Sequence, residues 1–334
     1  MINIYNKGFY NEITIMKAIA AFFITFFHFK ESVPQEFANI FVGGVIGNIL
    51  FFYCSGYLLK FKEEKFKGEW LVKKIIRLLP SVWVFMLFIS ICNFFRNNIS
   101  EIPWFSWIYP TKYWFINAII AFFLTAYLLK WYLTSDKRIR NWKHILRQRY
   151  IYIGAIFILA HIFWFFNFIW RPNKIIMDAQ GIECWFYYFL FFLWGFYTKQ
   201  TETSIKGKWQ QALLFPFSII IFYTYKKSAT YLDWLMDLQF IFIPILLVFV
   251  TYSARHFAVW IFNKNLPCCI KTAFVCISNL TLDIYIVQVY LMSWLMPKFI
   301  FPLNVFILFA VIFICAMANK NVADKIGTFL LKKL

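Results

Sequence analysis

Charged residues are scarce in this sequence, and acidic residues are the scarcest of them. Only 15% of the 334 residues are charged. The sequence contains 15 Asp and Glu residues and 34 Lys and Arg residues. A soluble chain carries about 25% charged residues, so this sequence cannot give a compact fold a water-facing surface. Hydrophobic residues make up 62% of the chain and aromatic residues 24%. The composition excludes a soluble globular protein and predicts an integral membrane protein.

Several chemical signatures are also missing from the sequence. It contains no Gly-rich phosphate loop, no HExxH zinc motif and no nucleophile elbow, and this argues against the enzyme classes that depend on those motifs. The seven cysteines show no metal-ligand spacing, so we expect no metal site and no permanently bound cofactor. Linkers and low-complexity tracts are absent as well. We therefore expect a single membrane domain over residues 1–334.

Long apolar runs fill most of the chain. A spanning helix needs about 20 mostly apolar residues. The sequence predicts an all-α bundle of about ten transmembrane helices at 13–30, 41–59, 81–95, 113–133, 151–170, 184–198, 211–225, 234–254, 273–293 and 302–318. The first run reaches full spanning length and lacks a small-residue cleavage site, so we interpret it as a span and not as a cleavable signal.

The basic residues between these runs predict the orientation. With the N-terminus inside, 25 Lys and Arg fall in inner segments and 8 in outer segments. Cytoplasmic loops carry such an excess, so we expect both termini in the cytoplasm and a multi-pass protein of the inner membrane. The net charge of +19 follows this loop pattern, and we expect no nucleic-acid partner.

Two polar residues in the first run require an explanation, because polar groups are costly inside a span. Lys17 and His28 are eleven positions apart. On a helix they share one stripe and lie roughly 16 Å apart along the axis. Lys17 then lies toward the cytoplasm and His28 toward the outside. A simpler interpretation stays open, in which Lys17 snorkels to the inner headgroups and His28 is interfacial. Among the other histidines, His144 and His256 are expected in basic loops and His161 in an aromatic run.

Four later segments carry further candidates. Ser55-Gly56 ends the second run and permits close helix packing. Lys74 and Arg77 in the following basic loop are three apart, so on a helix they share a face and could grip a polyanion. Asp283 lies within the ninth run, and an acid in a span is a candidate for a functional site. The fourth run opens with an aromatic cluster at Trp114, followed by Asn117.

Taken in order, the first segments resemble acyltransferase family 3, the bacterial membrane O-acyltransferases of surface polysaccharides, O-antigen and Nod factors. The family's first helix carries a basic residue, ten residues and then His, as Lys17 and His28 do. Its second helix ends in a phenylalanine-rich stretch with Ser-Gly, as FFYCSGYLL does at 51–59. Its next cytoplasmic loop has an arginine-rich stretch before a proline, and here KKIIRLLP occupies 73–80, with Lys73 and Lys74 beside Arg77.

The resemblance continues to residue 293. Trp114-Phe115 matches the Trp-Phe that often opens the family's fourth helix. TLDIYIVQ at 281–288 matches a late Ser-Leu-Glu-Ile-Tyr-Leu-x-His segment, with Asp283 for Glu and Gln288 for His. The departure at Gln288 leaves the role of that position open. The resemblance implies that Ser55, Trp114, Asn117 and Tyr285 line the site.

The resemblance implies a reaction as well. An acyl group, with acetyl expected, moves from cytoplasmic acetyl-CoA or another acyl-CoA to a hydroxyl of a cell-surface or lipid-linked saccharide. A hydroxyl is a poor nucleophile and needs a base, and His has a suitable pKa for that role. The expected catalytic residues are His28, Lys17 and Asp283. The expected donor-binding residues are Lys73, Lys74 and Arg77, because Lys and Arg bind phosphates well.

Two other functions stay open from the sequence alone. A transporter or flippase for a polysaccharide or lipid-linked sugar would explain intramembrane charge, but it predicts repeated halves and helices broken by Gly or Pro. The sequence has only 11 Gly and no evident repeat. A non-catalytic membrane scaffold leaves Lys17, His28 and Asp283 without a role.

Overall fold

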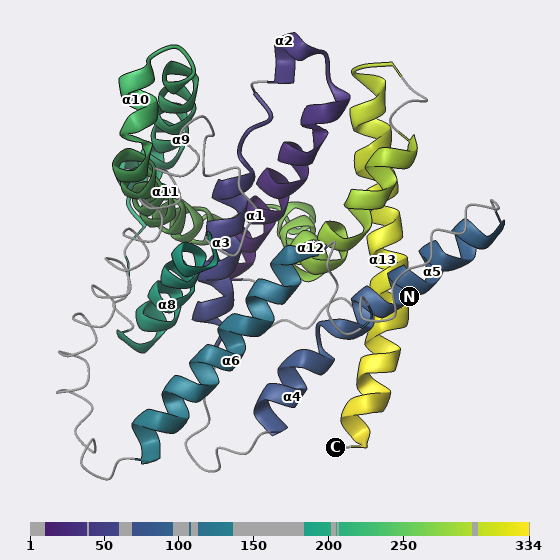
Figure 1. Cartoon of the computed structure of the whole chain (residues 1–334). Helices are drawn as coiled ribbons and strands as arrows, with labels where there is room; N and C mark the ends of the chain where they lie inside the picture. Colours follow the sequence, from purple (N-terminus) through teal and green to yellow (C-terminus); the bar gives the residue numbers. More distant parts are fainter. Residues whose placement is uncertain are drawn as a thin grey trace. The chain divides into compact units, whose positions relative to one another are not determined.

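The computed structural model describes residues 11–38, 40–59, 69–95, 107, 113–135, 184–201, 205, 207–295 and 300–333. The described part of the chain is all-α (Figure 1). The helices that correspond to expected spans are α1 (Glu12–His28), α3 (Gly44–Tyr57), α5 (Leu79–Phe95), α6 (Trp114–Ser135), α8 (Trp185–Thr201), α9 (Trp209–Ala229), α11 (Gln239–Phe262), α12 (Cys268–Leu295) and α13 (Leu303–Lys332). The expected span at 151–170 lies outside the described residues, as do His144 and His161.

Four described stretches are long and apolar enough to cross a membrane. They are Glu69–Phe95, Ile241–Phe262, Cys268–Met292 and Leu303–Lys332. Several apolar helices of this kind indicate a multi-pass membrane protein. The count of ten spans and the cytoplasmic location of both termini stay predictions.

The described helices fall into two compact units. The first unit contains α1, α3, α8, α9, α11 and α12 up to Thr281, with the short elements η1 (Phe29–Ser32), α2 (Gln35–Ala38) and α10 (Asp233–Asp237). The second unit contains α5, α6, α12 from Leu282, α13 from Phe306, and a helix α4 (Glu69–Ile76).

Helix α1 begins at a capping box. The Asn11 side chain accepts a hydrogen bond from the Thr14 backbone N–H at 3.0 Å, while the Thr14 hydroxyl oxygen lies 3.4 Å from the Asn11 backbone nitrogen, which donates to it. These two bonds satisfy backbone groups that have no partner within a helix. Further along, a Cβ at Gly47 of α3 would lie 2.7 Å from the Ala20 carbonyl oxygen. Glycine is therefore what lets α3 lie against α1.

Helices α3 and α8 touch through a reciprocal pair of glycines. A Cβ at Gly56 would overlap the carbonyl oxygen of Phe192, and a Cβ at Gly195 would overlap that of Tyr53. Each helix therefore presents a glycine to the other helix's backbone, the arrangement by which small residues bring membrane helices together. This geometry confirms the packing that the sequence predicted for Gly56.

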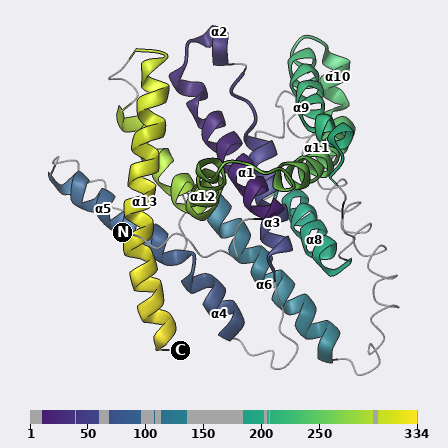
Figure 2. The same cartoon turned by 180° about the vertical axis from the view of Figure 1, so that it is seen from behind.

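Helices α9 and α11 form a second pair in the first unit. The Ser218 and Ser253 hydroxyl oxygens lie 3.0 Å apart between them. Both views show α10 at one end of this pair (Figures 1 and 2), and the Tyr225 hydroxyl donates to the Leu235 carbonyl of α10 at 2.7 Å. The sequence predicted one span at 234–254, whereas the chain forms α10 and then a longer α11.

The sequence predicted a loop around His256, and the C-terminal end of α11 shows that this prediction is wrong. Helix α11 continues to Phe262, so Arg255 and His256 are helical. His256 is buried, with its ring 4.5 Å from that of Tyr252. The helix continues past the predicted boundary because of tertiary contacts, since α11 packs against α1 and α3. The charge of Arg255 suggested a loop that these contacts override.

The basic segment after α3 is also partly helical. The sequence placed a loop before residue 81, but α4 covers Glu69–Ile76 and contacts α6. The Trp70 ring stacks on that of Tyr127 with centroids 6.4 Å apart. Packing of this side against α6 supports a helix in a segment whose charges suggested a loop.

Candidate functional site

Helix α1 places the two expected first-helix residues as the sequence predicted. Lys17 and His28 both lie within α1, and both are half-buried. Because the helix runs from Glu12 to His28, their separation along its axis is about 16 Å. One helix therefore carries a cationic group in its first half and an imidazole at its end.

His28 is the last residue of α1 and its ring is open to a further partner. The ring lies edge-on to Phe27, with centroids 5.5 Å apart. None of the described residues makes a hydrogen bond or an ion pair with the imidazole. A neutral imidazole has one donor and one acceptor nitrogen, so both remain available to a bound molecule.

Polar residues gather near the beginning of α1. The Tyr57 hydroxyl donates to a Glu12 carboxylate oxygen at 3.2 Å, and the Lys199 ammonium lies 5.3 Å from the centre of the Tyr57 ring. The half-buried Ser55 lies in the same last part of α3 as Tyr57. The beginning of α1 and the end of α3 therefore meet in the first unit.

The three expected donor-binding residues lie in the last part of α4 and just after it. Lys74 is half-buried, and its ammonium lies 5.4 Å from the Phe123 ring centre and 5.7 Å from that of Trp70. Lys73 pairs with Glu69 of the same helix at 3.6 Å. Arg77 follows α4 and is exposed. The aromatic contacts hold Lys74 in place by cation–π attraction, and the exposed Arg77 is accessible.

The start of α6 packs against the second half of α12. The Tyr113 hydroxyl donates to the Ile286 carbonyl at 3.2 Å, and the Tyr285 ring lies 5.1 Å from that of Phe115. Asn117 is buried one turn later, while Trp114 is half-buried. Of the expected lining residues, Tyr285 therefore lies at this helix contact, and Trp114 and Asn117 lie in the first turn of α6 beside it.

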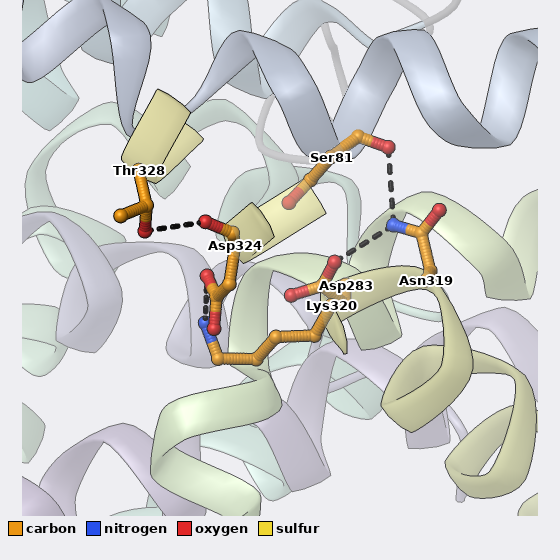
Figure 3. Close-up of polar contacts among 6 residues, drawn as sticks. All are labelled: Ser81, Asp283, Asn319, Lys320, Asp324 and Thr328. Atoms are coloured by element: carbon orange, nitrogen blue, oxygen red, sulfur yellow. Dashed lines mark hydrogen bonds and ion pairs between the residues drawn. The ribbon is translucent and has the colours of Figure 1, made fainter. Parts of the chain in front are cut away.

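Asp283 lies in a buried polar node with Asn319 and Ser81 (Figure 3). The Asn319 amide nitrogen donates to Asp283 Oδ1 at 2.7 Å and to the Ser81 carbonyl at 3.0 Å. Asp283 is 2% exposed. Burial of this acid agrees with the expectation for a charged residue in a span. Its carboxylate accepts this hydrogen bond from Asn319, a residue that the sequence analysis did not single out.

Gln288 is fully buried five residues further along α12. Neither its amide nitrogen nor its amide oxygen has a hydrogen-bond partner among the described residues. Such an amide is costly to leave unpaired in an apolar setting. The position where Gln288 replaces a histidine of the resembled family is thus occupied by a side chain with free hydrogen-bonding capacity.

Sequence reasoning missed two residues that the structure places among polar groups. Asn319 was not singled out, although it is a polar residue at the end of the last apolar run. Arg255 was counted among the residues of a loop, although it lies only one position past the expected span 234–254. In both cases the available signal was a polar residue at the edge of a hydrophobic segment.

The comparison with known proteins agrees with this geometry. No curated protein and no solved structure matches the chain. The family described as "Acyltransferase domain", acyltransferase family 3, matches residues 10–318. The match includes α1 with Lys17 and His28, the α4 cations and the α12 segment around Asp283. Since it covers most of the 334 residues, the chain belongs to acyltransferase family 3.

Proposed function

We propose that the chain is a membrane O-acyltransferase that moves an acyl group, with acetyl expected, from cytoplasmic acyl-CoA to a hydroxyl of a cell-surface or lipid-linked saccharide. The observation that carries this proposal is the imidazole of His28, which has no hydrogen-bond partner among the described residues and shares α1 with Lys17. An acyltransferase to a hydroxyl needs such a base.

His28 acts as the general base in this proposal. One ring nitrogen takes the proton of the acceptor hydroxyl as its oxygen attacks the thioester carbon. The tetrahedral intermediate then collapses and the carbon–sulfur bond breaks. The CoA thiolate leaves and takes a proton, which the imidazolium can return, so His28 ends the cycle neutral. General-base catalysis of this kind contributes about 10²–10⁴-fold to a rate.

An acyl-CoA donor is a long molecule with phosphates at one end and the thioester at the other. Helix α1 carries one polar side chain suited to each of these ends. The pantetheine arm of CoA sets the thioester well apart from the phosphates. The separation of about 16 Å between Lys17 and His28 along α1 suits a cation near the phosphates and a base near the thioester. Lys73, Lys74 and Arg77 are the further cations assigned to the donor.

The remaining site residues have supporting roles. Asp283 is assigned a catalytic role through its charge, within the node that Asn319 completes. Ser55, Trp114, Asn117 and Tyr285 are assigned to the lining of the site. The enzyme works in the inner membrane with both termini in the cytoplasm, where acyl-CoA is made, and its acceptor saccharide and membrane lipid are its other partners.

Transfer of labelled acetyl from acetyl-CoA in isolated membranes tests the proposal. We expect His28→Ala to lower transfer to its acceptor by about 10²–10⁴-fold, because the base is removed. Insertion and accumulation of the variant should match the wild type. His161→Ala, which changes a histidine expected in an aromatic run, is the control and should retain most of the transfer. Near-wild-type transfer by His28→Ala would refute the catalytic assignment.

A further inference from the structure

The last third of α13 carries an exposed apolar row beyond the uncharged portion of the helix (Figure 1). The first charged residue of α13 is Lys320. Past it, Val322, Ile326 and Phe329 are 48%, 37% and 58% exposed within the described part of the chain. Their spacing of four and then three residues places them on one side of the helix. Exposed apolar side chains in a row indicate a surface that meets another apolar phase or molecule.

A different side of this segment is packed within the second unit. Ala323 and Gly327 are buried, and a Cβ at Gly327 would lie 3.6 Å from the Ile76 carbonyl oxygen and 4.0 Å from the Pro80 side chain. At about 100° per residue, the packed pair and the apolar row point in directions about 110° apart. The second unit therefore fixes which side of α13 is exposed.

The lysines of this segment lie beside the apolar row, and its acid does not. Lys325, Lys332 and Lys333 are exposed, and at about 100° per residue they share a sector of about 120° with the row. Asp324 lies outside this sector and pairs with Lys320 at 3.1 Å. The exposed side thus combines apolar side chains with three cations and carries no acid of its own segment. We call these six residues the basic stripe: Val322, Lys325, Ile326, Phe329, Lys332 and Lys333.

The basic stripe continues a lipid-facing side of the same helix. Ile314 and Ala318 are both exposed, and with Val322 they form a row at a spacing of four residues. Of the four described stretches that are apolar enough to cross a membrane, α13 is the least buried. The side that faces lipid within the span therefore runs without interruption into the basic stripe, and the surface that adjoins lipid tails is the headgroup layer.

The depth of the lysines agrees with this position. The uncharged portion of α13 ends at Asn319, and Lys325 and Lys332 lie about 9 Å and 20 Å past it along the axis. The headgroup layer of one leaflet is about 5–8 Å thick, so Lys325 lies near its depth. Spanning helices tilt by about 20° on average and by up to about 40°. Tilt toward the exposed side brings the far lysines to the same layer.

The helix dipole explains only part of this arrangement. Lys332 and Lys333 lie at the C-terminal end of α13, where a cation is favourable whatever lies outside. Lys325 lies seven residues before Lys332, and the dipole effect falls off within the last turn. Lys325 is therefore the residue that distinguishes a lipid-binding surface from an ordinary helix end.

We propose that the basic stripe binds the headgroups of anionic phospholipids, with its lysines on the phosphates and its apolar side chains at the border with the acyl chains. Lys333 Nζ lies 4.6 Å from the centre of the Phe329 ring, so the two kinds of side chain are in contact. Clustered lysines beside a spanning helix attract anionic lipid, and an apolar row beside them adds burial at the interface. The proposal needs neither an acyl donor nor an acceptor, so it stands apart from the proposed function.

Removal of lysines tests the proposal. Phosphatidylglycerol, added to the full-length protein in neutral detergent, should raise the unfolding temperature more than phosphatidylcholine does. Lys325→Gln should weaken the apparent affinity for phosphatidylglycerol by about fivefold, and Lys325→Gln with Lys332→Gln by about 25-fold, because each lysine near an anionic surface contributes about fivefold. Unfolding without added lipid should stay unchanged, since both side chains are exposed.

Lys208→Gln with Lys264→Gln is the matched control. Both lysines are exposed residues of the first unit, and the sequence places them, like Lys325 and Lys332, in inner segments. The control removes the same charge and should keep the wild-type affinity for phosphatidylglycerol. An equal loss in the control would show a general effect of net charge and would overturn the site.

Amide hydrogen exchange locates the contact. Exchange of residues 322–333 should be slower in nanodiscs of phosphatidylglycerol than in nanodiscs of phosphatidylcholine, and the lysine double variant should lose this difference. Equal exchange in the two lipids for the wild type overturns the proposal without reference to any variant, and points instead to an acidic protein as the occupant. Wild-type affinity for phosphatidylglycerol in the double variant overturns it as well.

Discussion

Two buried polar positions, one in each unit of the molecule, differ in how their groups are paired. In the second unit, Asn319 donates to both Asp283 and the Ser81 carbonyl, so the acid is hydrogen-bonded. In the first unit, the Tyr53 hydroxyl and Arg255 Nε are buried and unpartnered among the described residues. A satisfied network rigidifies a helix contact, whereas unsatisfied donors have capacity left for a ligand. The comparison separates a hydrogen-bonded acid at a helix contact from buried donors that have no hydrogen-bond partner among the described residues.

The two units also differ in the contacts that hold their helices together. The first unit joins α3 to α8 through glycine contacts at backbone level. The second unit joins α12 to α13 and α5 through the side chain of Asn319. Close backbone packing leaves no room for a polar bridge, and it leaves the polar groups beside it free for other partners.

Breaking the glycine contact should have the largest effect. Gly195→Val adds side-chain atoms where the Tyr53 carbonyl lies, and we expect a loss of about 3 kcal/mol or more because α3 and α8 must separate. The yield of folded protein and its thermal unfolding in detergent measure this. Gly327→Ala in α13 is the control. A Cβ there would lie 3.6 Å from its nearest neighbour atom, the Ile76 carbonyl oxygen. That variant should be neutral or gain up to about 1 kcal/mol from helix propensity.

Removal of Asn319 should have the next largest effect. Asn319→Leu leaves the Asp283 carboxyl and the Ser81 carbonyl without their donor, and we expect a loss of about 1–3 kcal/mol. Adding Asp283→Leu should restore most of the stability, because an apolar pair can replace a buried polar pair. Thermal unfolding of both variants measures the difference. A single variant as stable as wild type would show that the node does not hold the second unit.

The α4 cations should give the smallest effect on the fold and a measurable one on the donor. We expect Lys74→Gln with Arg77→Gln to raise the acyl-CoA KM by about fivefold, because charged contacts to phosphate are lost. Unfolding temperature should change little. Lys264→Gln is the control, since Lys264 also lies over an aromatic ring, that of Trp260 at 5.2 Å, and has no assigned role. A KM that stays at the wild-type value would remove the α4 cations from the donor site.

The positions of the long helices could be predicted from the sequence, because apolar runs near spanning length are a strong signal. The residues at which these helices begin and end could not be predicted from the sequence. Charged residues suggested a loop at Arg255 and another before residue 81, but packing on α1 and α3 extends α11, and aromatic contacts with α6 support α4. Local composition does not reveal such contacts, since they join residues far apart in the chain.

The candidate site also has one part that could be predicted from the sequence and one part that could not. The stripe of Lys17 and His28 follows from helical geometry alone, so the sequence was sufficient to predict it. The partner of Asp283 was not predictable, because Asn319 lies 36 positions away on another helix. The unpartnered state of Tyr53 was equally hidden. An ordinary aromatic residue in an apolar run acquires meaning only when the contacts around its hydroxyl are known.

The length of α13 affects how the protein fits its bilayer. Its 30 residues extend about 45 Å, while a hydrocarbon core is about 30 Å thick. Its uncharged portion from Leu303 to Asn319 rises only about 24 Å before Lys320 begins the basic end. Such a helix matches a thin membrane, and a thicker one would draw Lys320 toward the lipid tails or force local thinning. Asn319 ends this uncharged portion, so we expect the contact between Asn319 and Asp283 to be sensitive to bilayer thickness.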